Sequence, residues 1–297
     1  MRDAALIAMR SSPEEIKDGE IAFFGGSFTA IDRDYMIELL SSAQEFIGEN
    51  GFKGIRISTR PDAVDGEICD ILEKYHVTAV ELGAQSTNDK VLAMNRRGHT
   101  REDIFRSARL LKERGFETGL QMMTGLYGSN DEDSIGTARD IISLSPDTAR
   151  IYPTVVIENT ELAELYRNGE YRPQTPEEAA VLCAKILPMF ERAGIKVIRL
   201  GLHSGGDVEG SFVAGAYHPA LREMCEGHIY FDIINRALSG KEKGKYIIYV
   251  APREVSKASG QRRCNIEKLR ELGYECRIKE NAALSARDIT LEKVNLL

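Results

Sequence analysis

The sequence lacks both a long apolar run and a close grouping of cysteines. No stretch approaches the ~20 apolar residues that a membrane-spanning helix needs, and residues 1–15 do not have the layout of a secretory signal. The cysteines are scattered and odd in number, which argues against a disulfide framework: Cys69, Cys183, Cys225, Cys264 and Cys276. These absences predict a protein of the reducing cytoplasm with no membrane partner.

Familiar catalytic motifs are missing as well. The sequence contains no Ser/His/Asp set, no His/Glu spacing typical of a metal site and no G-x-G-x-x-G that opens a helix. The histidines are dispersed, which favours structural or surface roles: His76, His99, His203, His218 and His228. These absences argue against an ordinary βα-barrel or Rossmann-like enzyme built on polar catalytic pairs.

The composition is that of a folded protein with an uneven distribution of charge. Of 297 residues, 42% are hydrophobic and 29% are charged, which is typical of a globular chain that buries most of its apolar surface. The net charge of −7 argues against a surface that binds nucleic acid throughout. Residues 241–279, however, hold eleven Lys/Arg against five Asp/Glu. This excess predicts either a local basic face or an ordinary solvated helical surface.

Short β-rich runs alternate with segments of helical period along the first two-thirds of the chain. Each helical segment carries one apolar stripe, and this alternation predicts an α/β fold with a parallel sheet and crossover helices. Polar or glycine-rich residues follow most of the strands, which favours a barrel mouth over the single crevice of a doubly wound sheet. The predicted strands are Glu20–Phe24, Gly54–Ser58, Thr78–Leu82, Glu117–Met123, Thr148–Tyr152 and Lys196–Leu200.

The character of the chain changes after residue 204. The glycine-rich stretch Gly205–Gly215 predicts a loop or linker. We therefore expect two domains, a partial barrel over residues 1–204 and a small α/β module over residues 205–297. The elements predicted for the module are a helix at Ile229–Leu238, a strand at Tyr246–Val250, a helix at Cys264–Leu272 and strands at Cys276–Ile278 and Ile289–Val294.

Two strand-end segments are candidates for ligand binding. Gly25, Gly26 and Ser27 follow the first predicted strand, where two glycines let the backbone come close to a ligand, although a tight turn also explains them. Thr59 and Arg60 follow the second strand. The Arg60 guanidinium suits a carboxylate or a phosphate, and an ordinary surface ion pair is the alternative.

Three further segments carry polar groups in informative places. Glu81 lies inside an apolar run, so a buried position would require a ligand amine, an arginine or water as its partner. Arg150 is either an anion anchor or an ion-pair partner. The turn at residues 260–263, with sequence Gly-Gln-Arg-Arg, either presents positive charge to a phosphate or is an exposed helix start.

Taken together, the strand-end segments resemble the radical S-adenosylmethionine (SAM) domain of the Elongator catalytic subunit and its short bacterial relatives. The match runs from about Ile21 to about Leu202, and oxygen-independent coproporphyrinogen oxidases share a weaker form of it. The implied fold is a partial (β/α)6-type radical-SAM barrel that lacks its first strand. The segments that carry the resemblance are Gly25–Phe28, Thr59–Asp62, Glu81–Ser86, Gly125–Gly128 and Tyr152–Val156 with Thr160 and Leu162.

The resemblance implies cofactors, a partner and residue roles. The family uses SAM and a [4Fe-4S] cluster to make a 5′-deoxyadenosyl radical, which in the Elongator subunit acts on a wobble uridine of tRNA. The basic stretch 241–279 is then a candidate tRNA contact, and Tyr152, on the substrate side, is the candidate catalytic residue. The positions that match the SAM pocket are Gly25, Gly26, Ser27, Thr59, Arg60, Glu81 and Gln85.

The cysteines depart from the family's pattern. The family binds its cluster through three closely spaced cysteines that leave one iron open for SAM, whereas no two cysteines here lie within ten residues of each other. We therefore expect no metal ligands in this chain, a truncation ahead of Met1 and no activity of the chain as given. The alternatives are a non-catalytic barrel that binds SAM or RNA, and a coproporphyrinogen-oxidase-like protein. The electron donor is not implied.

Overall fold

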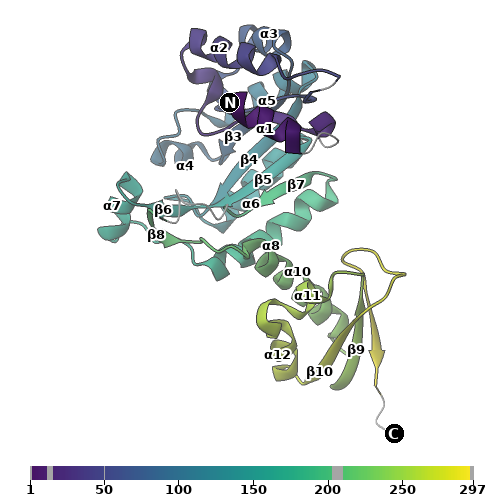
Figure 1. Ribbon diagram of the computed structural model, residues 1–297. Helices are drawn as coiled ribbons and strands as arrows, with labels where there is room; N and C mark the ends of the chain where they lie inside the picture. Colours follow the sequence, from purple (N-terminus) through teal and green to yellow (C-terminus); the bar gives the residue numbers. More distant parts are fainter. Residues whose placement is uncertain (1, 12–15, 50, 203–209, 295–297) are drawn as a thin grey trace. The chain divides into compact units, whose positions relative to one another are not determined.

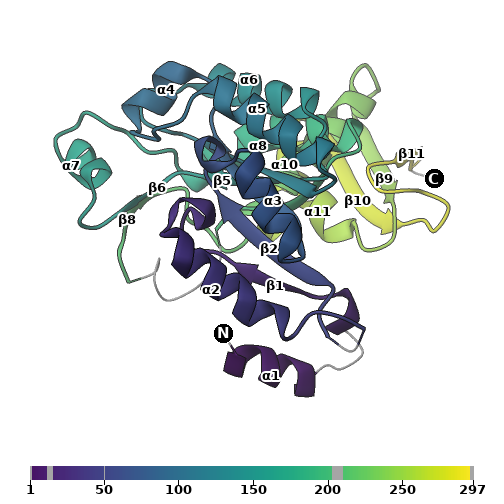
Figure 2. The ribbon, with the colours of Figure 1, turned by 90° about the horizontal axis from the view of Figure 1, so that it is seen from above.

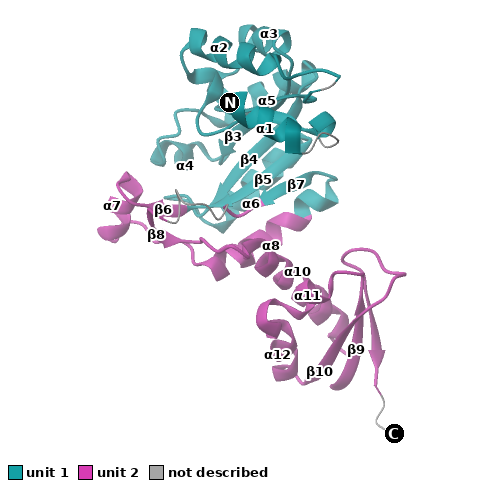
Figure 3. Cartoon of the chain, viewed as in Figure 1, with its two compact units in different colours: residues 1–154, 189–199 teal, residues 155–188, 200–297 magenta. Residues whose placement is uncertain are grey.

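A computed structural model describes residues 2–11, 16–49, 51–202 and 210–294. Two compact units, coloured separately in Figure 3, make up the chain. Unit 1 comprises Met1–Thr154 and Met189–Arg199, and unit 2 comprises Val155–Pro188 and Leu200–Leu297. The predicted barrel segment 1–204 thus contributes to both units, and the division into domains at residue 204 stays a prediction.

Unit 1 is built on a curled six-stranded sheet (Figure 1). The neighbour order is β1-β2-β3-β4-β5-β7, and every pair from β1 to β5 is parallel. The sheet confirms the predicted α/β fold of a partial barrel, with each predicted strand present. The strands are β1 (Glu20–Phe23), β2 (Gly54–Thr59), β3 (Val77–Gln85), β4 (Glu117–Thr124), β5 (Thr148–Pro153) and β7 (Lys196–Leu200).

Helices α3, α5 and α6 cover one face of this sheet (Figure 2). Capping boxes fix where two of them begin, through Thr100 with Asp103 in α5 and Asn130 with Asp133 in α6. The helical elements of unit 1 are α1 (Arg2–Ser11), η1 (Ile16–Asp18), η2 (Phe28–Ala30), α2 (Arg33–Gln44), η3 (Pro61–Ala63), α3 (Gly66–Lys74), α4 (Asp89–Met94), α5 (Arg101–Glu113) and α6 (Asp131–Ser143).

Successive residues of each strand point to opposite faces of the sheet. Ile57, Leu82 and Leu120 lie on the helix-covered face and are buried in its apolar core. The opposite face, here called the inner face, carries polar side chains from neighbouring strands. Its members are Arg56 and Ser58 of β2, Glu81 of β3, Gln121 of β4, and Arg150 and Tyr152 of β5.

Unit 2 contains two smaller sheets. Strand β6 (Val155–Ile157) pairs antiparallel with β8 (Phe212–Gly215), and a second sheet has the order β10-β9-β11. The loop predicted for Gly205–Gly215 is therefore wrong for its last four residues, which form β8. So short a strand shows no alternation, and its partner is distant in sequence. Residues 203–209 lie outside the described residues. The other elements are α7 (Glu161–Arg167), α8 (Pro176–Arg192, which ends in unit 1), α10 (Leu221–Leu238), β9 (Gly244–Val250), α11 (Val255–Ser259), η4 (Gln261–Arg263), α12 (Cys264–Glu271), β10 (Tyr274–Glu280) and β11 (Ile289–Lys293).

The second sheet of unit 2 packs against its helices around one apolar core. Tyr230 and Ile234 of α10, Ile248 of β9 and Leu269 of α12 are fully buried there. The predicted C-terminal α/β module is confirmed as a fold. No helix in the described ranges has both the length and the apolar content of a membrane span.

Candidate functional site

Glu81 is the centre of the inner face. Its side chain is only 1% exposed, and its carboxylate accepts hydrogen bonds from Arg150 Nη2 at 2.5 Å and from Gln121 Nε2 at 2.8 Å. Arg56 Nη1 lies 3.4 Å from the same carboxylate. A buried carboxylate is costly unless it is paired, and here two arginines and an amide from three other strands pair it. Of the partners expected for a buried Glu81, the structure therefore shows arginine.

Arg56 extends this network toward the amino ends of the strands. Its Nε donates to Glu20 at 2.7 Å and its Nη2 donates to Glu117 at 2.7 Å. Burial by itself lowers the pKa of Arg56, but the hydrogen bonds that it donates to Glu117 and Glu20 outweigh this effect, and the net shift is upward. Arg56 therefore stays charged and joins four strands. Arg56 was not among the predicted site residues, although its place two residues before Ser58 puts it on the same face.

Arg150 connects Glu81 to the exposed part of the inner face. Its Nη1 donates to the Tyr152 hydroxyl at 3.2 Å, and its guanidinium lies 5.2 Å from the centre of the Phe24 ring. The Nε atom is buried and has no hydrogen-bond partner among the described residues. The ion pair holds the guanidinium in one place, so Tyr152, a half-buried side chain, has a fixed donor at its hydroxyl.

The segment after β1 offers open backbone. A Cβ placed at Gly25 or Gly26 would meet no described atom within 4 Å, and Gly25 has φ +111°, which favours glycine. Ser27 precedes η2 and makes no capping hydrogen bond with its side chain. Thr59 behaves differently, because its hydroxyl lies 2.6 Å from the Thr29 hydroxyl and is buried on the helix-covered face. Its contacts position η2.

Three basic side chains gather at the carboxyl ends of β2 and β3. Arg60 donates to Asp62 at 2.9 Å, and a Cβ on Gly98 would lie 3.2 Å from Arg60 Nη2. Burial, and then the charge of Arg60, lowers the pKa of Arg97, whose buried Nε has no partner among the described residues. His99 is buried, with Nε2 3.1 Å from the Ala84 carbonyl and Nδ1 unpartnered in the described structure.

This basic cluster was only partly foreseen. Arg60 was among the predicted site residues and Arg97 was not, because Arg97 stands in an Arg-Arg-Gly run after α4 that shows no periodic pattern. Gln85 ends β3 with φ +64°, and its amide folds over Gly83, where a Cβ would lie 2.7 Å from Nε2. The ends of β2 and β3 therefore present cationic and amide groups together.

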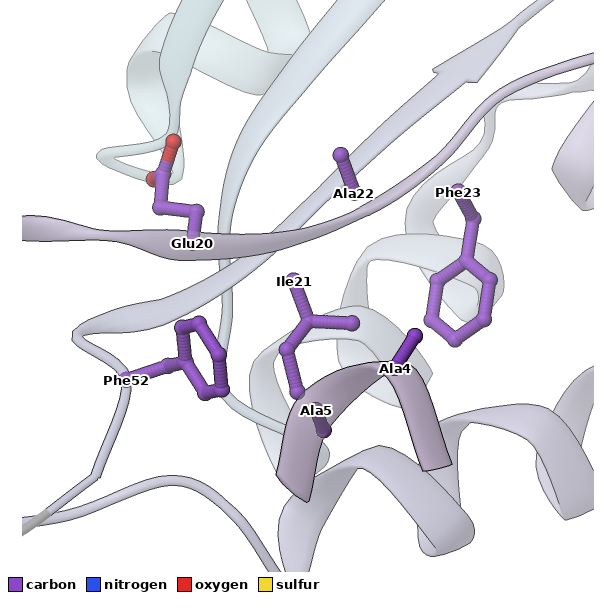
Figure 4. A pocket seen from close by; sticks show the side chains of 7 residues that line it. All are labelled: Ala4, Ala5, Glu20, Ile21, Ala22, Phe23 and Phe52. Atoms are coloured by element: carbon purple, nitrogen blue, oxygen red, sulfur yellow. The ribbon is translucent and has the colours of Figure 1, made fainter. Parts of the chain in front are cut away.

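A separate pocket lies between α1 and β1 (Figure 4). It encloses about 330 Å³ and is lined by Ala4, Ala5, Glu20, Ile21, Ala22, Phe23 and Phe52. Its polar member, Glu20, is already bound by Arg56 and by the Thr78 hydroxyl at 2.7 Å. The pocket contains none of the residues predicted to bind a cofactor.

Two family models match consecutive parts of this chain. The model of the radical SAM superfamily matches residues 4–141, and the model of the radical SAM C-terminal domain matches residues 146–230. Together with the curled parallel sheet, these matches show that the chain belongs to the radical SAM superfamily.

Within this superfamily the chain is similar to Elongator-type proteins. It is 32% identical over 196 residues to the tRNA uridine(34) acetyltransferase of Methanocaldococcus jannaschii, which covers 58% of this chain and 36% of the relative. It is 32% identical over 197 residues to human Elongator complex protein 3, which covers 57% of this chain and 35% of the relative. The chain thus spans about a third of the length of these curated relatives.

A solved structure shares the fold. The archaeal Elp3 of Methanocaldococcus infernus with an N-terminal deletion matches with a TM-score of 0.63 and 24% sequence identity. The match covers 77% of this chain and 62% of that chain. The resemblance predicted from the strand-end segments is therefore confirmed at the level of family and fold.

The thiols of this chain do not fit an iron–sulfur cluster. Cluster ligands are thiolates, yet burial raises the pKa of Cys69 to about 11 and that of Cys183 to about 12. Burial also raises the pKa of Cys276 to about 11, and Cys69 is the only cysteine in unit 1. Within the described ranges, no group of three His, Cys, Asp or Glu residues could hold a metal ion.

Proposed function

We propose that this chain supplies the SAM-binding and substrate-facing part of an Elongator-type radical SAM enzyme that modifies tRNA in the cytoplasm. The observation that carries the proposal is the strand-end arrangement, in which open glycine backbone follows β1 and a basic cluster follows β2 and β3. Two relatives of over 30% identity, named for tRNA uridine and for Elongator, support the substrate class. SAM, when bound, supplies the 5′-deoxyadenosyl group of the family's radical chemistry.

The methionine end of SAM carries an ammonium and a carboxylate, and the chain offers a partner for each. Gly25 and Gly26 are exposed, and no described atom lies within 4 Å of a Cβ placed on either, so a ligand ammonium can approach their backbone carbonyls. Arg97 and Arg60 are suited to the carboxylate, since an anion would relieve the repulsion between them. Gln85 closes this edge with an amide. Thr59 contributes by holding η2.

The substrate side lies along the inner face. Tyr152 is the proposed catalytic residue, with a hydroxyl that receives a hydrogen bond from Arg150. Because the oxygen accepts this bond from Arg150, the hydroxyl's own O–H is left to donate a hydrogen bond to a substrate atom. Glu81 neutralises Arg150 and thereby keeps the guanidinium from binding the substrate's phosphates itself.

A methyl group at Gly26 tests the SAM site. Gly26→Ala adds a Cβ where no described atom lies within 4 Å and where φ is not left-handed, so the variant folds normally. We expect its Kd for SAM, measured by calorimetry, to rise by about tenfold through loss of a hydrogen bond to a charged group. Gly136→Ala in α6, which also has open space, is the matched control and should bind SAM as the wild type does. Unchanged binding by the Gly26 variant would contradict the proposed site.

The position of the cysteines favours a second candidate, a barrel that binds SAM without cleaving it. Anaerobic reconstitution with iron and sulfide separates the two functions. Brown protein that releases 5′-deoxyadenosine from SAM supports the enzyme. Colourless protein that nevertheless binds SAM supports the binding barrel, since four of the five thiols are buried.

A further inference from the structure

A cavity in unit 2 lies beside the Gly-Gln-Arg-Arg turn. It encloses about 220 Å³ between α8, α10, η4 and α12. Typical small-molecule sites enclose about 300–1,000 Å³, so this cavity suits one part of a larger ligand better than a whole metabolite. Its lining residues are Glu177, Met224, Gly227, His228, Gln261, Cys264, Asn265 and Lys268.

The turn beside the cavity is held rigidly. Asn265 is 1% exposed, and its amide donates to the Gly227 carbonyl at 2.8 Å and to the Ala258 carbonyl at 3.1 Å. Gly260 packs so closely that a Cβ would lie 2.7 Å from Cys264 Sγ and 2.9 Å from Asn265 Cγ. These contacts tie α10, α11 and α12 together, so the turn is already ordered before any ligand arrives.

Two arginines project from this rigid turn. Arg262 and Arg263 are both exposed. Their φ angles are 52° and 64°, a backbone conformation that residues other than glycine rarely adopt. Neither side chain forms an ion pair or a hydrogen bond with another described residue. Both guanidiniums are therefore available, and a guanidinium binds phosphate through two parallel hydrogen bonds.

The surrounding charge favours a polyanion. Residues 241–279 carry a net charge of +6, whereas the whole chain carries −7, so the rest of the chain carries −13. Lys268 lies on the cavity wall, with Nζ 5.4 Å from the centre of the Phe231 ring. Positive charge concentrated in one segment of an acidic chain attracts a polyanion toward that segment.

The cavity also offers groups that can contact a nucleobase. Gln261 has an amide with donors and an acceptor, and Met224 contributes an apolar wall. Burial, and then the charge of Lys268, lowers the pKa of His228, so the imidazole is neutral near pH 7 and can both donate and accept. Bases of single-stranded RNA are unstacked and free to enter such a cavity, whereas those of a duplex are not.

We propose that unit 2 carries a binding site for single-stranded RNA, in which Arg262 and Arg263 hold backbone phosphates and an adjoining base enters the cavity between His228, Gln261 and Lys268. The choice of RNA over other polyanions rests on the proposed function. The site itself is independent of SAM.

Salt-dependent binding of an oligouridylate 15-mer to the full chain tests the proposal without SAM or turnover. The double variant Arg262→Ala/Arg263→Ala should weaken binding by about tenfold or more. Because each phosphate contact on a single strand contributes about 0.7 to the slope of log K against log salt, the slope should fall by about 1.4. If the RNA site fails while SAM still binds, only this inference is overturned.

The matched control is Arg277→Ala/Lys279→Ala, which removes the same charge from β10. Both of these side chains alternate with the buried Cys276 and so lie on the sheet face away from the core. The control should change the affinity little. Equal losses in the two double variants would overturn the proposal in favour of general charge attraction. Equal competition by polyglutamate would overturn it in favour of an acidic protein partner, and saturation by inorganic phosphate in favour of a free anion.

Cys264 provides an independent readout. It is half-buried on the cavity wall, whereas the other four cysteines are buried, so a thiol reagent modifies Cys264 first in the folded protein. Bound oligouridylate should slow this modification in proportion to occupancy, as followed by mass spectrometry. RNA that binds without protecting Cys264 would overturn the placement of the base.

Discussion

The two faces of the unit 1 sheet are built from the same strands and do different work. On the helix-covered face, Leu82 and its neighbours are apolar and fully buried. On the inner face, Glu81 is just as buried, but it is bound to two arginines and an amide from three other strands. One strand therefore supplies stability through one set of alternate residues and a site through the other. Substitutions on each face should separate the two roles.

Glu81→Ala should have the largest effect. It leaves the half-buried Arg150 without its carboxylate, whereas Arg56 keeps Glu20 and Glu117 as partners. Loss of one member of such a pair costs about 3–5 kcal/mol of unfolding free energy. Urea denaturation measures the loss. The double variant Glu81→Ala/Arg150→Met should recover most of it, since both charges of the closest pair are then gone. Additive losses in the double variant would show that the two residues are not coupled.

Leu82→Ala should reduce stability nearly as much and leave the affinity for SAM unchanged. The side chain is fully buried on the helix-covered face, so its truncation creates a cavity and costs about 2–5 kcal/mol. Calorimetry below the unfolding transition should give an unchanged Kd for SAM. A change in SAM affinity would mean that the two faces are not independent.

Asn130→Ala should have a moderate effect on the helix layer. The Asn130 side chain accepts a hydrogen bond from the Asp133 backbone N–H at 3.0 Å and begins α6. Loss of such a cap costs about 1 kcal/mol, visible as a lower midpoint in urea. Asn130→Ser, which keeps an acceptor, is the control and should stay close to the wild type.

Arg60→Gln, which breaks the ion pair with Asp62 at the end of β2, should have the smallest effect on stability. It should be seen in the pH dependence of that stability. The hydrogen bond from Arg60, and then its charge, hold the pKa of Asp62 below its ordinary value of 3.8. The stabilisation is therefore complete above that value and is lost as the pH falls through the lower pKa of the folded state. NMR titration of the Asp62 carboxyl carbon should give a midpoint below 3.8 in the wild type and a higher one in Arg60→Gln. Equal midpoints would mean that the pair does not form in solution.

Periodicity predicted the sheet because the strands are buried and repeat at regular intervals. The six strands of unit 1 were predicted to within a few residues of their ends. Strand β8 was missed, because a four-residue strand whose partner lies far away in sequence leaves no local signal.

The candidate site was predictable only in part. The need of a buried Glu81 for a ligand amine, an arginine or water followed from the cost of burying its charge, but which side chains meet that need depends on strand register. Thr59 was expected to line the SAM pocket, and its contact with Thr29 depends on which face its strand position takes. The closeness of Arg97 to Arg60 depends on the path of a loop, which no periodic pattern encodes.

The adjacency of Glu81 and Leu82 also protects the chain against misassembly. If β3 shifted by one residue against its neighbours, the Glu81 carboxylate would enter the apolar core beneath the helices. Leu82 would then take its place among the arginines of the inner face. Both changes are unfavourable, so two independent costs oppose a shift in the register of β3. An insertion or deletion of a single residue within this strand would therefore remove the site and the fold together.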